Sequence, residues 1–367
     1  MKNICIVTGA RPNFIKVAPL IKAINKLQLE GQNVEYKLVY AGKIDDSTLE
    51  QSLFDDLQIP RPHVYLGIDC ESLNELTGRI MFEFDNYLNA NPMDMVIVVD
   101  DLTSTMAAAI VTKKRGLPLA HIVAGTRSFD INMPKEINRL VIDSLSDYLF
   151  TAGANTSGIA MRGGQESADV YLVGNILMDT LRSNYNRLKR PEVADRLALD
   201  KDNYLLFTIN RKVLINDHEK LSSIIEAMCN SVNEMKIIAP LREPASSRIK
   251  SLSEKYSHLH IIDPLPYLEF AYIAANAKCI VTDSGNVAEE ATFNSVPCIT
   301  INNYTEHIET VTHGSNVLIG EDMDILKKYI NEAVCGIWKK CTLPDRWDGR
   351  AGERIIKILL QMNNGKN

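Results

Sequence analysis

The sequence has 367 residues and lacks the features that mark several broad classes of protein. Its net charge of −6 provides no basic field to attract nucleic acid or an anionic membrane. No apolar run approaches the length of a membrane-spanning helix. The opening stretch NICIVTG has the pattern of a strand and leaves no room for a signal peptide. We therefore expect a cytoplasmic protein with neither nucleic acid nor a membrane as its partner.

Motifs that bind common cofactors are also missing. The seven cysteines stand singly, form no CxxC pair and lack zinc-ligand spacing, which predicts free thiols in a reducing compartment. The sequence contains no GxGxxG and no GxxxxGK followed by serine or threonine. It therefore indicates neither a dinucleotide-binding oxidoreductase nor a P-loop nucleotidase.

Short apolar runs alternate with amphipathic segments, and the alternation occurs in two sets. NICIVTG, MDMVIVV and PLAHIV belong to the first set, and the pattern restarts at NYLLFTIN. Repeated strand–helix units predict parallel sheets with helices on both faces. We predict an α/β protein of two doubly wound, Rossmann-like domains, 1–180 and 200–350, joined through a charged segment near 182–203. A helix in 351–367 could pack on either domain.

Ligands of open parallel sheets bind beyond the carboxyl ends of the strands. Two such domains facing one another would form a cleft lined by the residues that follow their strands. The turn TGARPNFIK after the first strand carries Arg11 and Lys16, whose charges suit a phosphate or a carboxylate. A solvated helix start explains these two residues equally well.

The segment TDSGNVAEEA predicts a strand end, a tight turn at Ser284 and Gly285, and a helix start. Backbone N–H groups at such a helix start can bind an anion. Glu290, one turn further on, could accept both hydroxyls of a ribose. The alternative is an acidic first turn that only complements the helix dipole.

Two further segments place carboxylates near strand ends. VVDDLTST puts Asp100 and Asp101 at a strand end, where adjacent residues face opposite ways, so we expect one of them to point into the cleft. An ordinary helix N-cap is the alternative. In MPKEINR, Glu136 and Arg139 are three apart on one helix face and can form an ion pair without any function.

Taken together, these segments resemble the non-hydrolysing UDP-N-acetylglucosamine 2-epimerase family over nearly the whole chain. TGARPNFIKVAPLI is similar to the family's G-T-R-P-E-x-I-K-x-A-P-L. HIVAGTRSFDINMPKEINR is similar to H-x-E-A-G-x-R-S-F-D-x-x-M-P-E-E-I-N-R. VGNILMDTL and TDSGNVAEEA match G-N-x-x-x-D-x-L and T-D-S-G-G-x-Q-E-E-A.

The resemblance implies a GT-B-like arrangement, the one that a large class of glycosyltransferases shares, with a C-terminal helix crossing back onto the first domain. It implies a homodimer that binds UDP or a UDP-N-acetylhexosamine in the cleft and needs no metal or redox cofactor. In the implied reaction a base removes the C2 proton and UDP leaves C1. UDP then adds back to the bound glycal as the proton returns to the opposite face.

The resemblance also implies roles for individual residues. Asp101 and Glu136 would be the catalytic carboxylates, and Arg139 would support Glu136 or the diphosphate. Glu306 and Glu309 match the acids of the family's T-E-R-P-E. The residues expected to bind substrate are Arg11, Lys16, Arg139, Arg211, Ser284, Gly285, Glu290 and Glu309.

The departures from the family pattern are concentrated where the chemistry takes place. Val123 replaces the catalytic Glu, and Asn210 replaces the His of an H-R motif. Valine cannot accept a proton and asparagine does not titrate, whereas a general acid or base typically contributes 10²–10⁴-fold in rate. The remaining departures are Asn13, Lys43, Ile44, Ser144, Arg242, Ala288 and Asn302.

Three hypotheses remain open at this point. The first is a UDP-N-acetylhexosamine 2-epimerase that uses Asp101 and Glu136. The second is a non-catalytic nucleotide-sugar-binding homologue that pairs with or regulates an active epimerase. The third is a glycosyltransferase or nucleotide-sugar hydrolase on the same frame, because a fold does not by itself determine a function.

Overall fold

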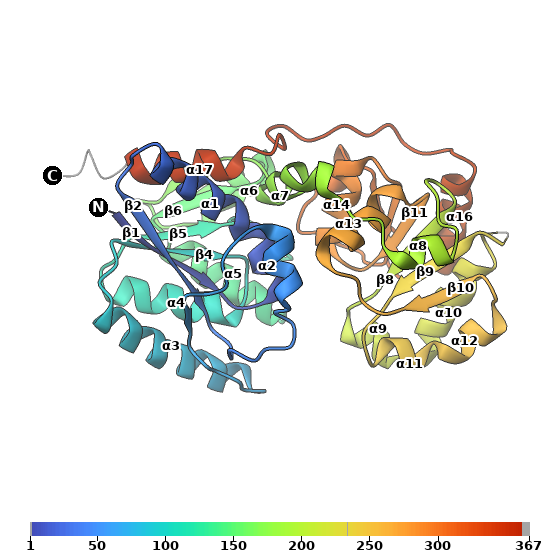
Figure 1. The fold of residues 1–367 in the computed structure, drawn as a ribbon, viewed down its shortest axis with the longest axis horizontal. Helices are drawn as coiled ribbons and strands as arrows, with labels where there is room; N and C mark the ends of the chain where they lie inside the picture. Colours follow the sequence, from blue (N-terminus) through green and yellow to red (C-terminus); the bar gives the residue numbers. More distant parts are fainter. Residues whose placement is uncertain (1, 233, 362–367) are drawn as a thin grey trace. The chain divides into compact units, whose positions relative to one another are not determined.

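The structure is a computed structural model that describes residues 2–232 and 234–361. The chain divides into two compact units (Figure 1), and each has its own sheet and core. Unit 1 consists of Met1–Ser183 together with Asp345–Asn367, and unit 2 consists of Asn184–Pro344.

In the described part of unit 1, seven parallel strands form one sheet in the order β3-β2-β1-β4-β5-β6-β7. Their central members are continuous apolar runs, as expected for strands covered on both faces. The strands are β1 (Lys2–Thr8), β2 (Val34–Tyr40), β3 (Val64–Tyr65), β4 (Met95–Val99), β5 (Leu119–Ile122), β6 (Tyr148–Thr151) and β7 (Asp169–Leu172).

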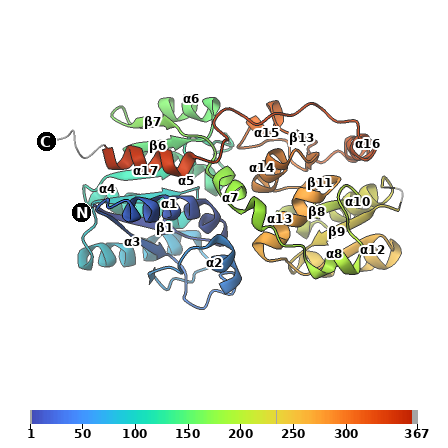
Figure 2. The ribbon, with the colours of Figure 1, turned by 45° about the horizontal axis from the view of Figure 1, so that its top comes forward.

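Helices cover both faces of this sheet (Figures 1 and 2). On one face α3, α4 and α5 pack side by side, and on the other α1 lies next to α17. The helices of unit 1 are α1 (Arg11–Leu29), α2 (Gln51–Leu57), α3 (Leu73–Ala90), α4 (Thr103–Lys114), α5 (Pro134–Leu145), α6 (Ala154–Gly163), α7 (Ile176–Asn184, ending at the boundary) and α17 (Ala351–Gln361).

Unit 2 is built in the same way around a second parallel sheet. The described strands follow the order β10-β9-β8-β11-β12-β13. They are β8 (Tyr204–Thr208), β9 (Lys236–Pro240), β10 (Leu259–Ile262), β11 (Cys279–Thr282), β12 (Cys298–Thr300) and β13 (Asn316–Leu318). The helices are α8 (Glu192–Arg196), α9 (Lys212–Asn216), α10 (His218–Cys229), α11 (Ala245–Arg248), α12 (Lys250–Lys255), α13 (Tyr267–Asn276), α14 (Gly285–Asn294), α15 (Glu309–Thr312) and α16 (Met323–Val334), with a 3₁₀ turn at Tyr185–Arg187.

The C-terminal segment belongs to unit 1, and it joins that unit earlier than the sequence boundary at residue 350. The chain returns at Asp345 because Trp347 is buried in unit 1 and donates its indole N–H to the carbonyl of Ala152 at 3.1 Å. Gly352 allows α17 to approach α1 closely, since a Cβ there would lie 2.9 Å from Pro19. Asp179 accepts the N–H groups of Ala351 and Gly352 at 3.0 and 2.8 Å and so caps α17.

Candidate functional site

Each sheet has a point at which its strand order reverses direction. In unit 1 this switch point lies between β1 and β4, and in unit 2 it lies between β8 and β11. Ligands of such sheets bind at the carboxyl ends of the strands beside the switch point. The loops there begin at Gly9 and Asp100 in unit 1, and at Ile209 and Asp283 in unit 2. The residues selected from the sequence therefore lie where this class of sheet binds ligands.

Asp100 and Asp101 follow β4 and bind different partners. Asp100 has a left-handed backbone (φ +60°), and its carboxylate accepts from Lys16 Nζ at 2.6 Å and from Asn13 Nδ2 at 2.9 Å. The Asn13 oxygen in turn accepts the N–H of Gly9 at 2.9 Å. The amide of Asn13 suits this position because it donates to Asp100 and accepts from Gly9. A glutamate here would bring a second negative charge next to Asp100. Lys16 is therefore a buried ion-pair partner, not an open cation.

Asp101 turns the other way, towards α5. Arg139 donates to Asp101 Oδ2 from Nε at 2.9 Å and from Nη2 at 2.5 Å. Lys135 Nζ lies 3.4 Å from the other oxygen, and Asn138 donates to the Asp101 carbonyl at 2.8 Å. The N-cap interpretation of this segment is wrong: Leu102 is the N-cap of α4, and no side chain among the described residues caps that helix.

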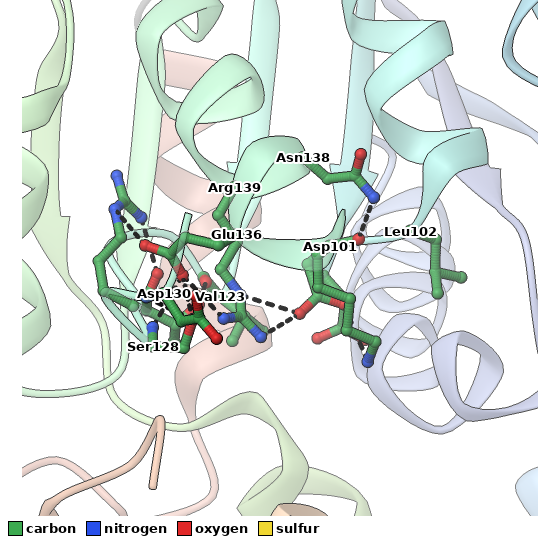
Figure 3. A network of polar contacts seen from close by, with 12 residues as sticks. Asp101, Leu102, Val123, Ser128, Asp130, Glu136, Asn138 and Arg139 are labelled. Atoms are coloured by element: carbon green, nitrogen blue, oxygen red, sulfur yellow. Dashed lines mark hydrogen bonds and ion pairs between the residues drawn. The ribbon is translucent and has the colours of Figure 1, made fainter. Parts of the chain in front are cut away.

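Arg139 also binds Glu136, so one guanidinium joins the two carboxylates expected to be catalytic. Figure 3 shows Arg139 between Asp101 and Glu136. Nη1 donates to Glu136 Oε2 at 3.1 Å, which confirms the ion pair predicted from their spacing. The same oxygen accepts the backbone N–H of Ser128 at 2.7 Å and its hydroxyl at 2.8 Å.

The electrostatics of this site keep both carboxylates ionised. Burial alone would raise the pKa of Asp101, but the charges of Lys135 and Arg139 outweigh it and hold the pKa below its usual value. Burial likewise acts to raise the pKa of Glu136, and the hydrogen bonds from Ser128 and Arg139 lower it further than burial raises it. At neutral pH both groups are therefore proton acceptors and not acids.

Val123 occupies the position that follows β5, where the family pattern has a glutamate. Its backbone is left-handed (φ +70°), a conformation that β-branched residues rarely adopt. The side chain is half-buried and lines an apolar recess with Ile122, Phe150 and Ile355. The end of β5 thus presents a hydrocarbon held in a strained conformation.

Three residues outside the predicted catalytic and substrate-binding sets form a second layer beneath this site. His121 on β5 hydrogen-bonds Asp143 on α5 at 2.6 Å, and Arg127 lies 2.6 Å from the other oxygen of Asp143. Arg127 also lies 3.8 Å from Glu136. A signal was present in the sequence: Glu136, Arg139 and Asp143 recur at helical spacing, which predicts one polar face buried against the sheet.

The switch point of unit 2 is organised around Asp283. Its carboxylate accepts the backbone N–H groups of Asn210 and Arg211, at 2.6 to 3.0 Å, which ties the loop after β8 to the loop after β11. Burial raises the pKa of Asp283 despite these bonds. The Arg211 guanidinium donates to the carbonyl of Ile301 at 3.2 Å, and Asn210 is exposed.

The helix start expected to bind an anion forms as predicted at α14. Ser284 is the N-cap, and its N–H donates to Thr282 Oγ1 at 3.0 Å. A Cβ on Gly285 would meet none of the described residues within 4 Å, so the backbone there faces open space. Glu290 is buried on the same helix.

Glu309 is the first residue of α15 and is buried. Its two carboxylate oxygens have no hydrogen-bond partner within residues 2–232 and 234–361. Nearby in the sequence, His307 lies 3.3 Å from Glu289, and Glu306 is half-buried. A buried carboxylate without donors is costly to fold, and a ligand that brings hydroxyl or N–H groups would relieve that cost.

The other departures from the family pattern lie mostly at the surface. Lys43 pairs with Asp69 at 2.7 Å beside a pocket that Gly9 and Tyr40 also line. Ile44, Ser144 and Arg242 are exposed, Asn302 is half-buried and Ala288 is buried in the core of unit 2. Arg11 is the first residue of α1 and is half-buried.

Comparison with known proteins identifies the frame that carries these residues. A model of the UDP-N-acetylglucosamine 2-epimerase family matches residues 27–360. The chain belongs to this family. It is 32% identical to the UDP-N-acetylglucosamine 2-epimerase of Methanocaldococcus jannaschii, over 97% of this chain and 98% of the relative.

Two further comparisons place this family member among solved and curated relatives. The crystal structure of the M. jannaschii enzyme in complex with UDP-GlcNAc and UDP superposes with a TM-score of 0.83 at 32% identity, covering 98% of this chain and 100% of that one. The UDP-2,3-diacetamido-2,3-dideoxy-D-glucuronate 2-epimerase of Pseudomonas aeruginosa is 33% identical over 98% of this chain and 100% of its own length. The predicted family and two-sheet α/β fold are confirmed.

Among the helices of residues 2–232 and 234–361, none combines the length and apolar character that a membrane crossing requires. The same residues contain no group of three or more His, Cys, Asp or Glu side chains placed to hold a metal ion.

Proposed function

We propose that the protein binds a UDP-N-acetylhexosamine and epimerises it at C2 by elimination and re-addition of UDP. The observation that carries this proposal is the bridge from Arg139 to Asp101 and Glu136 at the switch point of unit 1. Epimerisation needs a carboxylate that is ionised, fixed in place and beside a cation that can stabilise developing negative charge. This arrangement meets all three requirements.

The contacts suggest different roles for the two carboxylates. Glu136 Oε2 receives three donors, and the side chain is 4% exposed. Lys135 Nζ lies 3.4 Å from Asp101 Oδ1, and the Asp101 side chain is more exposed, at 12%. We therefore propose Asp101 as the base that takes the C2 proton, and Glu136 as the group that holds Arg139 in position.

The nucleotide would be bound by the residues that the family resemblance selected in unit 2. Arg211 and the N–H groups at Ser284 and Gly285 suit the diphosphate. Glu290 and Glu309 offer buried carboxylates to the hydroxyl groups of the ribose. In unit 1, Arg11 remains a candidate for the diphosphate. Lys16 has Asp100 as its charge partner, and we assign it to fixing the loop after β4.

A second candidate function, nucleotide-sugar binding without catalysis, is favoured by Val123. The strained valine at the end of β5 cannot transfer a proton, and the exposed Asn210 cannot replace a histidine. The remaining carboxylates are both ionised, so neither is ready to return a proton. In this alternative the protein would partner or regulate an active epimerase. In either case we propose that the protein is cytoplasmic and forms a homodimer. Sedimentation in solution would test the homodimer.

The test is incubation with UDP-N-acetylglucosamine in D₂O, with NMR observation of C2 and calorimetry of UDP binding. Deuterium at C2 or formation of the manno epimer would support the first function. UDP binding without exchange would support the second and reject the first. Irreversible release of free UDP without exchange would reject both and indicate a transferase or hydrolase.

A further inference from the structure

His121 lies at the centre of unit 1 and hydrogen-bonds through both ring nitrogens. It is 1% exposed on β5. Nδ1 lies 2.6 Å from Asp143 Oδ1, and Nε2 lies 3.0 Å from the backbone carbonyl oxygen of Asp100. Neither contact is to the substrate-facing surface, so His121 does not take part in the chemistry proposed above.

The partners of the two ring nitrogens of His121 determine how many protons these two hydrogen bonds require. A carbonyl oxygen only accepts, so Nε2 must carry a proton. A neutral imidazole would then present a lone pair from Nδ1 to Asp143. Because the separation is 2.6 Å, one proton must lie between Nδ1 and Oδ1, on either the ring or the carboxyl group.

The surroundings of Asp143 decide where that proton resides. Its other oxygen accepts from Arg127 Nη1 at 2.6 Å and from the N–H of Gly125 at 3.1 Å. The carboxyl group is therefore the ionised member of the pair, and the imidazole holds both protons. The other charges next to these groups are Glu136 beside Arg127 and the Asp100–Lys16 pair.

The carbonyl that Nε2 binds belongs to the turn that carries Asp101. Asp100 has a φ of +60°, a conformation that costs a non-glycine residue free energy unless its surroundings hold it. Three side chains from other elements fix this turn: Lys16 and Asn13 on the Asp100 carboxylate, and Asn138 on the Asp101 carbonyl. His121 supplies a further bond from a side chain, to the Asp100 carbonyl.

We propose that His121 is a buried imidazolium that acts as a positioning residue, fixing the turn at Asp100 so that Asp101 faces the substrate. The cation lies beneath the site, touches no reacting atom and is neutralised by Asp143. Its contribution to the reaction rests on the proposed epimerase function, whereas its protonation state does not.

The protonation state is measured directly in the full chain labelled with ¹⁵N only at histidine rings. The chain has seven histidines, and we expect the ring of His121 to keep two protonated nitrogens at pH 7.5, where exposed imidazoles are largely neutral. Its signal is assigned by its loss in His121→Asn, or by elimination through single replacements of the other six. A ring with one unprotonated nitrogen at that pH would overturn the proposal. Asp143→Asn should convert the ring to the neutral form.

The positioning role is measured by C2 exchange kinetics. His121→Asn should lower kcat by about 10²-fold, the order expected for a misplacement of about 1 Å, with KM changed by less than about threefold. His218→Asn, at an exposed position on α10, is the matched control and should leave both constants unchanged. An unchanged kcat, or a change in KM alone, would overturn the positioning role. If the wild type shows no exchange, the epimerase proposal fails while the NMR result still decides the charge on His121.

Discussion

Arg139→Met removes the group on which the site of unit 1 depends while keeping a long side chain. Asp101 loses two hydrogen bonds and Glu136 loses one. Arg139 is 1% exposed, so water cannot replace the guanidinium without entering the core. Two carboxylates are then left buried without their principal counter-charge.

The expected cost follows from this burial. Removing one partner of a buried ion pair typically costs about 3–5 kcal/mol. For a unit of about 200 residues, 1 kcal/mol corresponds to roughly 2–4 °C in Tm, so the unfolding of unit 1 should shift down by roughly 6–20 °C at pH 7. The variant is destabilised mainly through Asp101 and Glu136, whose pKa values should both rise.

The pH dependence of the stability loss in Arg139→Met distinguishes the loss of charge from the loss of packing. In the wild type the pKa of each carboxyl is lowered, so their contribution to stability is present above pH ~4 and is lost as pH falls through the folded pKa. The variant lacks this contribution. The difference between wild type and variant should therefore be largest between pH 6 and 8 and should narrow towards pH 4.

Thermal unfolding at several pH values, followed by circular dichroism, provides the assay. Arg139→Lys should recover part of the loss, because an ammonium keeps the charge but not the paired geometry. Lys135→Met is the matched control, since its side chain is 56% exposed and an exposed pair contributes at most about 1 kcal/mol. A loss below 1 kcal/mol for Arg139→Met at pH 7, or a loss that does not vary with pH, would refute the reasoning.

Three further predictions concern other parts of the chain. Burial raises the pKa of Asp179 to about 6, so the contribution of Asp179 to stability should fall by about 2 kcal/mol as pH rises from 4 to 7. In urea unfolding, the stability of Asp179→Asn relative to the wild type should rise by this amount over the same pH range, and parallel profiles would contradict the assignment. Glu309→Gln should stabilise unit 2 by about 1 kcal/mol and weaken UDP binding about tenfold by calorimetry, and an unchanged affinity would remove Glu309 from the nucleotide site. Val123→Glu combined with Asn210→His should raise C2 exchange at least about tenfold. Val123→Gly is the control, because it relieves the strained backbone at residue 123 without adding a base. If the double variant shows no gain in exchange, the sugar pocket itself differs from the family pattern.

The features that the sequence predicted correctly are those set by local patterns. Continuous apolar runs identify strands covered on both faces, and two sets of them predict two parallel sheets. The Glu136–Arg139 pair could be predicted because both residues lie on one helix, three positions apart.

The features that the sequence did not predict depend on long-range pairing or on backbone strain. Arg139 reaches Asp101 from 38 positions away, and Lys16 reaches Asp100 from 84. Nothing in the residue types reveals which of two adjacent carboxylates turns towards α5. The left-handed backbone at Val123 is equally hidden, because valine normally indicates the opposite conformation.

The point at which the chain returns to unit 1 is also hidden in the sequence. The returning segment is anchored by one buried tryptophan, Trp347, which donates to a carbonyl of Ala152 far back in the chain. A composition shift marks the linker near residues 182–203, but no such shift marks this return.

The central claim is that Asp101, held by Arg139, takes the C2 proton of a UDP-N-acetylhexosamine. The most direct measurement compares deuterium incorporation at C2 of UDP-N-acetylglucosamine in D₂O between the wild type and Asp101→Asn, with UDP affinity measured in parallel. The account predicts exchange in the wild type, a loss of at least about 10²-fold in the variant, and UDP affinities within about threefold of each other. Exchange that persists in Asp101→Asn, or a wild type that binds UDP without any exchange, would contradict it.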